Sequence, residues 1–559
     1  MSEKDTVKEN PEDDEDWMSY ANAGFGATDY SLWDDDGETA EILVEPDFDD
    51  IQLDTGEEEI PAAPRPAGLK HLVRIGTCNH CLGRVGGKKK FGQSFVDSGN
   101  EIRASIVESD STMSNARELE PLCQFCENLM EEAPLLAEII NESIGNKECN
   151  RLQLGARFPK DQTEAEDHLR KRFGAGGSAA LKSTLVDEVA SHLRKLNPSV
   201  KLVIDKPEIL ALIDVLTLTV DLDIRSHYIY GRYRKLERGI PQTKWPCRSC
   251  KGRGCMKCDQ TGMQYPNSVQ GLIGDPLLDL FGSKEHAFHG MGREDIDVRC
   301  LGRGRPFVIE MKQPIKRDIE GQLLMDTINK EASGSIEVTN MRPSNRSEVV
   351  RVKDTPAEKS YTIRFKINPI TQEEMDTLTQ VMEIPKQRGR QGRRRRQRHP
   401  NNQVVEEKPN TEELTKLKKA DLVSICEEKG LKKSGTKEVL IERISNAKPK
   451  TLEMPNEDKV MEIMTKLQGC TLAQRTPERV AHRRADKIRK RKVVETSEAI
   501  IGYDDQGNMF GQFNLRCESG TYVKETIHGD NGRTQPSIAS LIGAKCVVEW
   551  LDVADIHAD

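Results

Sequence analysis

The sequence predicts an α+β fold made of several domains, and three observations support this. The chain has 559 residues, and because one domain commonly holds roughly 100 to 200 residues, more than one is expected. Short apolar runs such as HLVRI and KLVID alternate with helical patterns over residues 69–223, while strand-like runs (SHYIYGRY, RPFVIEM, SIEVT, YTIRFKI) crowd residues 224–385. Residues 411–447 have helical periodicity only. Helices and sheets should therefore occur together, with one small all-helical part.

The N-terminal segment differs from the rest of the chain in charge. Residues 1–60 hold 22 Asp and Glu against two Lys, so the overall net charge of -9 leaves a net of +11 for residues 61–559. We expect residues 1–67 to be an acidic, disordered tail whose partner the sequence does not reveal. It is either a solvated tail or a competitor for the basic surface, and that surface suggests a polyanionic partner.

The N-terminus has neither the basic start nor the apolar core of a signal peptide, and no apolar run approaches the roughly 18 residues of a membrane span. We therefore expect a cytoplasmic chain that does not enter a membrane.

A basic linker and a helical pair follow the strand-rich region. Residues 386–410 have no apolar pattern and contain eight Lys or Arg between Lys386 and Arg398. Residues 411–447 should form two helices, the first ending near Gly430 and the second opening at Ser434 and Gly435. Their expected core is Leu414, Leu417, Leu422, Ile425, Leu440, Ile441 and Ile444. Because the mixed pattern resumes at residue 456, the linker and helices together look like an insertion.

Eight of the 14 cysteines occur in two clusters with the spacing of metal ligands. One cluster combines two C-x-x-C pairs, Cys78 with Cys81 and Cys123 with Cys126; the other, CRSCKGRGCMKC, holds Cys247, Cys250, Cys255 and Cys258. Four thiolates give the closed tetrahedral shell of structural zinc, which leaves no open position for catalysis. We expect one or two structural Zn²⁺ sites; the alternative is buried but unrelated cysteines. Arg253 and Lys257, inside the second cluster, could meet phosphate.

Five runs in the chain, the first of which contains Cys78 and Cys81, resemble the motifs of a known family. They are CNHCLGR (78–84), YGRYRKLERGIPQTKW (230–245), FHGMGREDIDVRCLGRGRPFVIEMKQP (288–314), QRTPERVAHRRADKIRKRKV (474–493) and GTYVKETIHGDNGRTQPSI (520–538). Together they resemble the archaeal-type tRNA pseudouridine synthases that act at positions 54 and 55 in the T arm. The resemblance implies a zinc-binding and THUMP-related RNA-binding domain over residues 68–223. It also implies a mixed α/β catalytic domain in two parts, residues 224–385 and 456–559.

The resemblance also implies the catalytic residues. The family's R-x-D element is here Arg293-Glu294-Asp295, so Asp295 is the candidate nucleophile or base, with Asp297 as the rival carboxylate. Lys524 occupies the place of the basic partner, and Tyr361 matches a tyrosine that stacks on the target base. Family members break the N1 to C1′ bond of uridine and rejoin the base through C5, without a catalytic cofactor. Attack on the sugar, attack on the pyrimidine and a glycal route all remain open.

A stacked uridine must be extruded from tRNA, and phosphate contacts would supply the energy. The candidate RNA-binding residues are Arg232, Tyr233, Arg234, Lys235 and Arg293 in the earlier motifs, and Arg479, His482, Arg483, Arg484, Arg489, Arg491 and Tyr522 in the later ones. The alternative for these cations is a solvated helix face.

The insertion departs from the family. It resembles a SAP domain, with Lys432, Lys433 and Lys437 toward phosphate, so it could bind another nucleic acid; the alternative is a protein-interaction module. Two other functions compete with the enzyme, namely a non-catalytic zinc-stapled protein that binds or folds tRNA and a DNA-associated factor.

Overall fold

The computed structural model describes residues 64–86, 92–113, 122–382, 411–428, 431–445, 451–482 and 484–558. These residues form two compact units. The first contains the chain up to Ile229 with Gly274–Ala287 and Ile309–Glu320, and the second contains Tyr230–Ile273, Phe288–Val308 and Gly321–Asp559. The expected acidic tail, apart from its last four residues, and the basic linker lie outside the described residues. No helix within the described ranges is long and apolar enough to cross a membrane.

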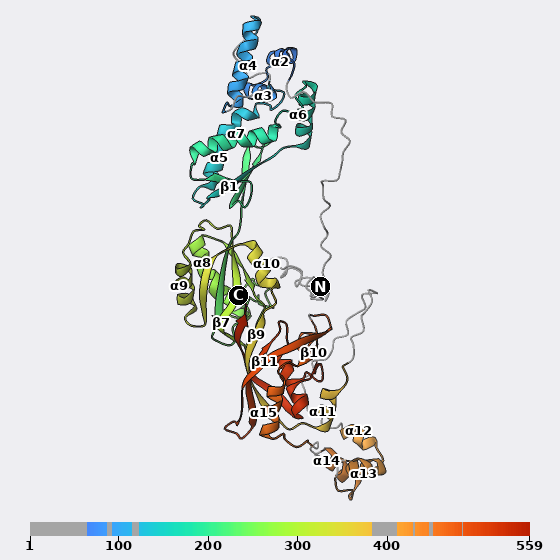
Figure 1. The fold of residues 1–559 in the computed structure, drawn as a ribbon. Helices are drawn as coiled ribbons and strands as arrows, with labels where there is room; N and C mark the ends of the chain where they lie inside the picture. Colours follow the sequence, from blue (N-terminus) through green and yellow to red (C-terminus); the bar gives the residue numbers. More distant parts are fainter. Residues whose placement is uncertain are drawn as a thin grey trace, which may run out of the picture. The chain divides into compact units, whose positions relative to one another are not determined.

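The first unit packs helices on a small sheet (Figure 1). Its sheet has the strand order β2 (Lys201–Leu202), β1 (Arg151–Arg157), β3 (Ile209–Asp214) and β4 (Thr219–Ile224). Strand β1 is parallel to β2 and β3, and β4 is antiparallel to β3. The helices are α2 (Pro66–Arg74), α3 (Asn79–Val85), α4 (Phe95–Ser109), α5 (Ala133–Ile144), α6 (Lys160–Arg172) and α7 (Leu181–Leu196), with the 3₁₀ turn η3 (Leu129–Glu132) before α5.

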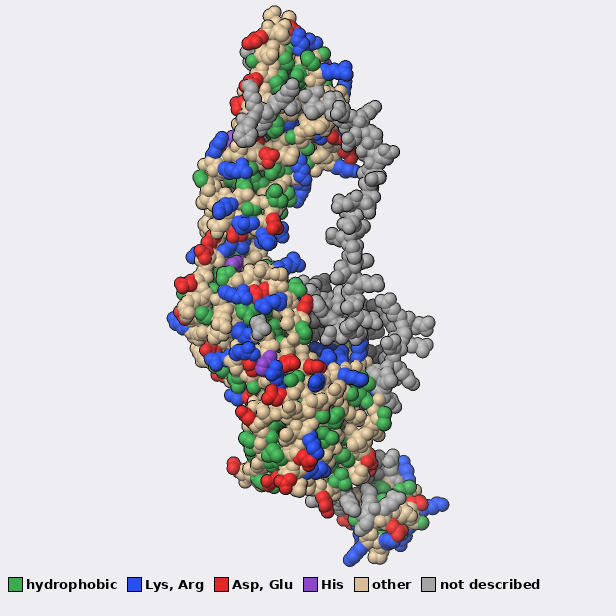
Figure 2. All heavy atoms as spheres, in the orientation of Figure 1, with side chains coloured by type: hydrophobic (Ala, Val, Ile, Leu, Met, Phe, Trp, Pro, Cys, Tyr) green, Lys and Arg blue, Asp and Glu red, His purple; other side chains and the backbone are tan. Residues whose placement is uncertain are grey.

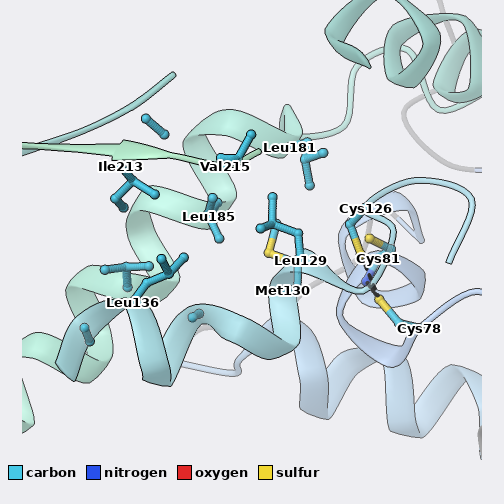
Figure 3. Packing of buried hydrophobic residues seen from close by; sticks show 14 of the residues in the cluster. Cys78, Cys81, Cys126, Leu129, Met130, Leu136, Leu181, Leu185, Ile213 and Val215 are labelled. Atoms are coloured by element: carbon cyan, nitrogen blue, oxygen red, sulfur yellow. Dashed lines mark hydrogen bonds between the residues drawn. The ribbon is translucent and has the colours of Figure 1, made fainter. Parts of the chain in front are cut away.

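One apolar core joins the elements of this unit (Figure 3). Leu136 from α5, Leu185 from α7 and Ile213 from β3 are fully buried in it. Strand β3 alternates buried and half-buried residues along ILALID, as expected when one face of a sheet is covered by helices. The same cluster continues into Cys78, Cys81 and Cys126. The first cysteine cluster is therefore part of the core of this unit.

A ten-stranded sheet, most of whose residues belong to the second unit, follows the first sheet in the chain. Its order is β13 (Thr534–Gln535), β10 (Thr471–Arg475), β11 (Ile488–Tyr503), β12 (Met509–Cys517), β9 (Glu358–Asn368), β14 (Lys545–His557), β7 (Arg299–Lys312), β5 (His227–Lys235) and β8 (Ile336–Ser344), with β6 (Glu285–Gly290) paired to β7. Strand β9 is antiparallel to both β12 and β14, whereas β14 is parallel to β7. Strands from both parts of the motif-bearing sequence thus share one sheet, in which β9 of the first part lies between β12 and β14 of the second.

Helices are interspersed with these strands along the chain. They are α8 (Val269–Phe281), α9 (Gly321–Ala332), α10 (Arg346–Asp354), α11 (Gln372–Thr379), α15 (Glu457–Lys466), α16 (Val523–His528) and α17 (Ile538–Ile542), with the 3₁₀ turns η4 (Met256–Cys258) and η5 (Glu478–Val480). Helix α16 ends at Gly529, whose φ of 78° is the left-handed value that glycine adopts without strain. The predicted mixture of helices and sheets is confirmed.

The helical pair of the sequence appears as three short helices, α12 (Thr411–Lys416), α13 (Lys419–Glu428) and α14 (Lys437–Ser445). The expected core is present: Leu414, Leu422, Leu440, Ile441 and Ile444 are buried with Cys426, and Leu417 and Ile425 pack against them. Gly430 lies outside the described residues. Where the chain returns, Thr451 bridges Thr371 and the Leu452 amide donates to the Ile370 carbonyl at 2.8 Å. The chain before the insertion is therefore hydrogen-bonded to the chain after it.

Candidate active site

Asp295 lies in the loop between β6 and β7, and a cation from a distant helix reaches it. The Asp295 side chain is 42% exposed, so the carboxylate is open to solvent on one side. Lys524, at the start of α16, places Nζ 3.5 Å from Asp295 Oδ2. The same Nζ lies 2.9 Å from Asp297 Oδ2. Lys524 thus contacts both candidate carboxylates, of which Asp297 is the more exposed, at 68%.

A second cation, Arg479, forms an ion pair with Asp295. Arg479, in turn η5, places Nη1 3.4 Å from Asp295 Oδ2 and donates from Nε to Glu525 Oε1 at 2.7 Å. Glu525 is next to Lys524 in α16 and is only 1% exposed. Although burial works against the charge, the hydrogen bond to Glu525 raises the pKa of Arg479 overall. Helix α16 therefore supplies Lys524 directly and holds Arg479 through the buried carboxylate of Glu525.

Asp297 has a different environment. Partial burial works against its charge, but the hydrogen bond from Lys524 outweighs that and lowers the pKa of Asp297. Its backbone carbonyl accepts from Arg238 at 2.6 Å. Asp297 is thus a charged, solvent-facing neighbour that competes for the Lys524 ammonium.

A buried lysine holds the backbone of the Asp295 loop. Lys235, fully buried at the end of β5, donates from Nζ to the carbonyls of Ile240, Asp295 and Ile296 at 2.9, 3.2 and 3.1 Å. Burial lowers the pKa of Lys235. Gln242 adds a donor to the Gly292 carbonyl at 3.0 Å. The loop is therefore held by side chains at both ends of residues 292–296.

A buried ion pair lies next to Asp295 in the chain. Glu294 Oε2 is 2.9 Å from Arg305 Nε, and both side chains are essentially unexposed. The Tyr233 hydroxyl donates to Glu294 at 3.0 Å, and Arg305 also donates to the Met291 carbonyl at 2.7 Å. Because each charge is buried, the pair is stable only while both partners are present. Glu294 thus points into the protein, while Asp295 points to the open side.

Three of the predicted RNA-binding residues lie inside the protein. Arg232, Tyr233 and Lys235 are buried, and Arg232 donates to carbonyls of Arg303, Gly304, Ile556 and Ala558. Arg234 pairs with Glu337. Arg232, Tyr233 and Lys235 thus make their polar contacts within the protein. The run SHYIYGRY becomes an interior strand, and this position in the sheet, which the residue types did not show, decides their burial.

Tyr361 and Lys359 project from β9. Tyr361 pairs in register with Leu515 of β12 and Val553 of β14. Burial raises the pKa of the Tyr361 hydroxyl well above its usual range, and the charge of Asp295 contributes to that rise. Lys359 was not singled out by the sequence; its Nζ lies 3.9 Å from where a Cβ at Gly292 would stand. Burial lowers the pKa of Lys359 to about 8.

The later basic motif lies on β10, β11 and the loop between them, where Figure 2 shows Lys and Arg side chains gathered. Arg484 donates to the Tyr522 hydroxyl at 3.2 Å, and Arg489 donates to Thr476 Oγ1 at 3.1 Å. His482 is exposed, Arg491 is half-buried and donates to the Lys490 carbonyl, and Arg483 lies outside the described residues. His482 and Arg484 thus belong to the loop that carries Arg479, and Arg489 and Arg491 lie on the strand that follows it.

Ion pairs fix the base of that loop. Asp486 accepts hydrogen bonds from Arg475 at 2.6 Å and from Arg533 at 3.2 Å. The hydrogen bond from Arg475, followed by the charges of Arg475 and Arg533, lowers the pKa of Asp486. The Arg533 guanidinium also donates to the Thr476 carbonyl at 3.0 Å. Arg479 is thus presented by a braced loop.

Both cysteine clusters have the geometry of a metal site. In each, the four Sγ atoms lie within 4.8 Å of one another. Cys78 and Cys126 are 3.7 Å apart, and the Cys250–Cys258 and Cys255–Cys258 separations are 3.8 and 3.6 Å. A tetrahedral zinc with bonds of about 2.3 Å requires sulfur separations of roughly 3.8 Å. Either quartet could therefore hold a structural metal.

The first quartet has a charged neighbour suited to thiolates. Arg84, whose side chain is fully buried, donates to Cys81 Sγ at 3.8 Å and to Glu166 Oε1 at 2.6 Å. A buried cation beside sulfur compensates the negative charge of a four-thiolate shell.

Comparison with known proteins gives the family. The family described as "Pus10, C-terminal" matches residues 228–408 and 381–557. The tRNA pseudouridine synthase Pus10 of Methanothermobacter marburgensis is 32% identical over 486 residues, 86% of this chain and 94% of that protein. Those of Methanothrix thermoacetophila and Methanopyrus kandleri are each 30% identical, over 87% of this chain and 93% and 96% of their own lengths. This chain belongs to the Pus10 family.

The matched ranges contain the whole candidate site of this Pus10 family member. Asp295, Tyr361, Arg479 and Lys524 all fall within them, as does the second cysteine quartet, whereas the first quartet precedes them. The two ranges overlap at residues 381–408, where the sequence predicted the basic linker. The resemblance read from the motifs is thus confirmed for the family.

Proposed function

We propose that this chain converts uridine to pseudouridine in the T arm of tRNA, at position 54, position 55 or both, with Asp295 as the reacting carboxylate. Its family makes it a tRNA pseudouridine synthase, which is an isomerase. The observation that carries the assignment to Asp295 is its position, half exposed at the end of a braced loop and within 3.5 Å of both Lys524 and Arg479.

The geometry supports a charged carboxylate as the working group. At an effective dielectric near 20, a cation about 3.5 Å away gains on the order of 5 kcal/mol before screening, and solvent on the open side reduces that. Lys524 and Arg479 together compensate the charge of Asp295 when a base displaces water. The carboxylate then attacks the sugar or the pyrimidine, or removes a proton on a glycal route.

Tyr361 is proposed to hold the detached uracil. A tyrosine hydroxyl is protonated at neutral pH, and burial raises the pKa of this one further. A neutral ring beside the carboxylate provides a face on which a pyrimidine stacks while it rotates. Asp295 would thus act on the bond and Tyr361 would retain the base.

The loop between β10 and β11, together with the start of β11, is proposed to bind the RNA backbone. Phosphate contacts from its cations would offset the few kcal/mol needed to unstack the target. The contributing residues are His482, Arg483, Arg484, Arg489 and Arg491, with Tyr522 and Arg293 nearer the carboxylate. Arg479 belongs to the same loop, so RNA binding and the position of the second cation are linked.

We propose Zn²⁺ as the metal of both quartets, in a structural role. Zinc would fix α3 against the segment before η3 in one unit and fold residues 246–263 in the other. The reaction needs no catalytic cofactor in this proposal.

The SAP-like reading of the insertion also remains a proposal. Lys432 is exposed, but Lys433 pairs with Glu427, and Lys437 donates to the Thr415 carbonyl at 2.8 Å. Phosphate would have to compete with these contacts. The acidic tail and the cytoplasmic localisation stay predictions of the sequence.

Pseudouridine mapping tests the function. Purified protein is incubated with an unmodified tRNA transcript, and Asp295→Asn is compared with Asp297→Asn. We expect Asp295→Asn to form no product while tRNA affinity stays within a few-fold of wild type, and Asp297→Asn to retain turnover. Product from Asp295→Asn at the wild-type rate would eliminate Asp295 as the reacting group.

A further inference from the structure

Residues 246–263, which contain the second cysteine quartet, form a compact loop that we call the knuckle. We propose that the knuckle is an RNA-binding surface that holds tRNA beside the catalytic loop; the inference rests on the proposed function and adds a second contact to it. Its ligand class is the phosphate backbone of RNA. Three features of the knuckle support this role: its rigidity, its charge and its connection to Asp295.

The knuckle is closed at its base and tightly wound. Pro246 and Met263 form an antiparallel bridge, and the Cys247 amide donates to the Gly262 carbonyl at 2.7 Å. Gly262 has a φ of 71°, and a Cβ there would stand 2.3 Å from the Gly252 carbonyl oxygen, so no side chain fits. The four Sγ atoms converge inside. Side chains on the outside are thus displayed from a fixed frame.

The outside of the knuckle is basic. Arg248, Lys251, Arg253 and Lys257 are all exposed, and Asp259 is its one acidic residue. None of these four cations forms an ion pair with a carboxylate among the described residues. Even if four thiolates and Zn²⁺ add a buried charge of −2, the knuckle keeps a net positive charge, and the cations face solvent. Met256, 86% exposed, offers an apolar contact at the same surface.

Contacts at the base connect the knuckle to the catalytic loop. The guanidinium of Arg293, two residues before Asp295, lies 5.2 Å from the centre of the Trp245 ring. Trp245 precedes the knuckle, packs edge-on against Tyr265 at 5.6 Å and accepts from the Gln264 amide at 2.8 Å. Trp245, before the knuckle, thus contacts Arg293 of the catalytic motif, and Gln264 and Tyr265, after the knuckle, pack on Trp245. RNA bound at Asp295 would therefore lie close to the base of the knuckle.

RNA is a better match than protein for this surface. Protein interfaces are depleted of lysine, whereas phosphates are contacted chiefly by Arg and Lys. A surface with four exposed cations, none of them in an ion pair among the described residues, and one exposed thioether suits a polyanion with bases that can pack on an apolar group.

The test compares Arg253→Gln/Lys257→Gln with wild type in the full chain. Neither residue is a cysteine, so zinc content, measured on the same preparations, should be unchanged. We expect the KM for a tRNA transcript to rise roughly 5- to 20-fold and kcat to stay within two-fold. The slope of log KM against log salt should become shallower by about two, roughly one for each lost phosphate contact. Lys330→Gln/Lys353→Gln, which removes exposed cations of α9 and α10, should leave KM and slope unchanged.

An unchanged KM and salt slope in the knuckle variant, or an equal change in the control variant, would overturn the inference. A filter-binding assay with unmodified tRNA, read without turnover, gives the same comparison. If wild type binds tRNA but makes no pseudouridine, the proposed function fails while the knuckle is still tested by binding. If wild type is active and the knuckle variant binds as wild type does, only the knuckle inference fails.

Discussion

The substitution Glu294→Gln should destabilise the second unit and impair catalysis, although Glu294 faces away from the substrate side. Glu294 and Arg305 lie 2.9 Å apart with exposures of 0% and 1%. Removing one partner of a buried pair leaves the other charge uncompensated, which costs about 3–5 kcal/mol. A neutral amide still accepts from the Tyr233 hydroxyl, so most of the loss should come from Arg305. The loop from residue 291 to 295 should then lose its fixed backbone.

Urea denaturation followed by tryptophan fluorescence measures this loss, because Trp245 and Trp550 lie in the second unit. Zinc is kept constant in all samples. The matched control is Glu462→Gln, which removes the carboxylate of the exposed pair with Lys466 in α15 and should shift the denaturation midpoint little, because solvent screens such a pair. We also expect kcat of Glu294→Gln to fall at least about ten-fold, since about 1.4 kcal/mol of lost positioning gives that factor.

A double variant separates the pair from its surroundings. Glu294→Gln combined with Arg305→Met removes both charges, so it should be less destabilised than the sum of the two single variants. The reasoning is refuted if Glu294→Gln shifts the denaturation midpoint no more than Glu462→Gln does.

Three further predictions follow from the site. Arg479→Gln should lower kcat roughly ten-fold with little change in KM, because it removes a cation from Asp295, whereas Arg484→Gln should mainly raise KM; the reverse pattern in steady-state kinetics on tRNA would contradict the assignment. Lys359→Met should stabilise the chain by up to about 3 kcal/mol at pH 7, since its pKa of about 8 in the folded protein lies below the unfolded value near 10.5. Below pH 8 the folded wild type carries the full free-energy cost of the buried charge, and that cost disappears as the pH rises from 8 toward 10.5. The difference in unfolding free energy between Lys359→Met and wild type should therefore narrow over this range. A difference that stays constant with pH would be inconsistent with a buried charge. Metal analysis should find two zinc ions per chain, Cys250→Ser should leave about one, and two in that variant would show that the second quartet does not bind zinc.

Much of the site could be predicted because its elements are local in sequence. Cysteines two residues apart direct two thiolates to one point whatever the surrounding fold, so C-x-x-C pairs identify a candidate metal site directly. The small helical core around Leu422 and Leu440 could likewise be read from periodicity, because helix geometry fixes which residues share a face. Asp295 came from the motif resemblance, which depends on neighbouring residues only.

Which side chains face the interior, and which residues distant in the chain they contact, could not be predicted in this way. Arg232, Tyr233 and Lys235 carry the residue types of an RNA-binding surface, yet β5 lies between β7 and β8 inside the sheet, where both faces are covered. Their polar groups then form hydrogen bonds with backbone carbonyls and with Glu294, because buried donors and charges must find partners within the protein.

By itself, the sequence determined which residues can do chemistry here: the carboxylate of Asp295, the amine of Lys524, the ring of Tyr361 and two sets of four thiols. The tertiary structure decided which of them meet. Arg479 and Asp295 are 184 residues apart in the chain, and only the order of strands in the sheet brings the β10–β11 loop, helix α16 and the β6–β7 loop to one place. The physical reason is that side-chain chemistry is a property of a residue, whereas burial and proximity belong to the packed chain.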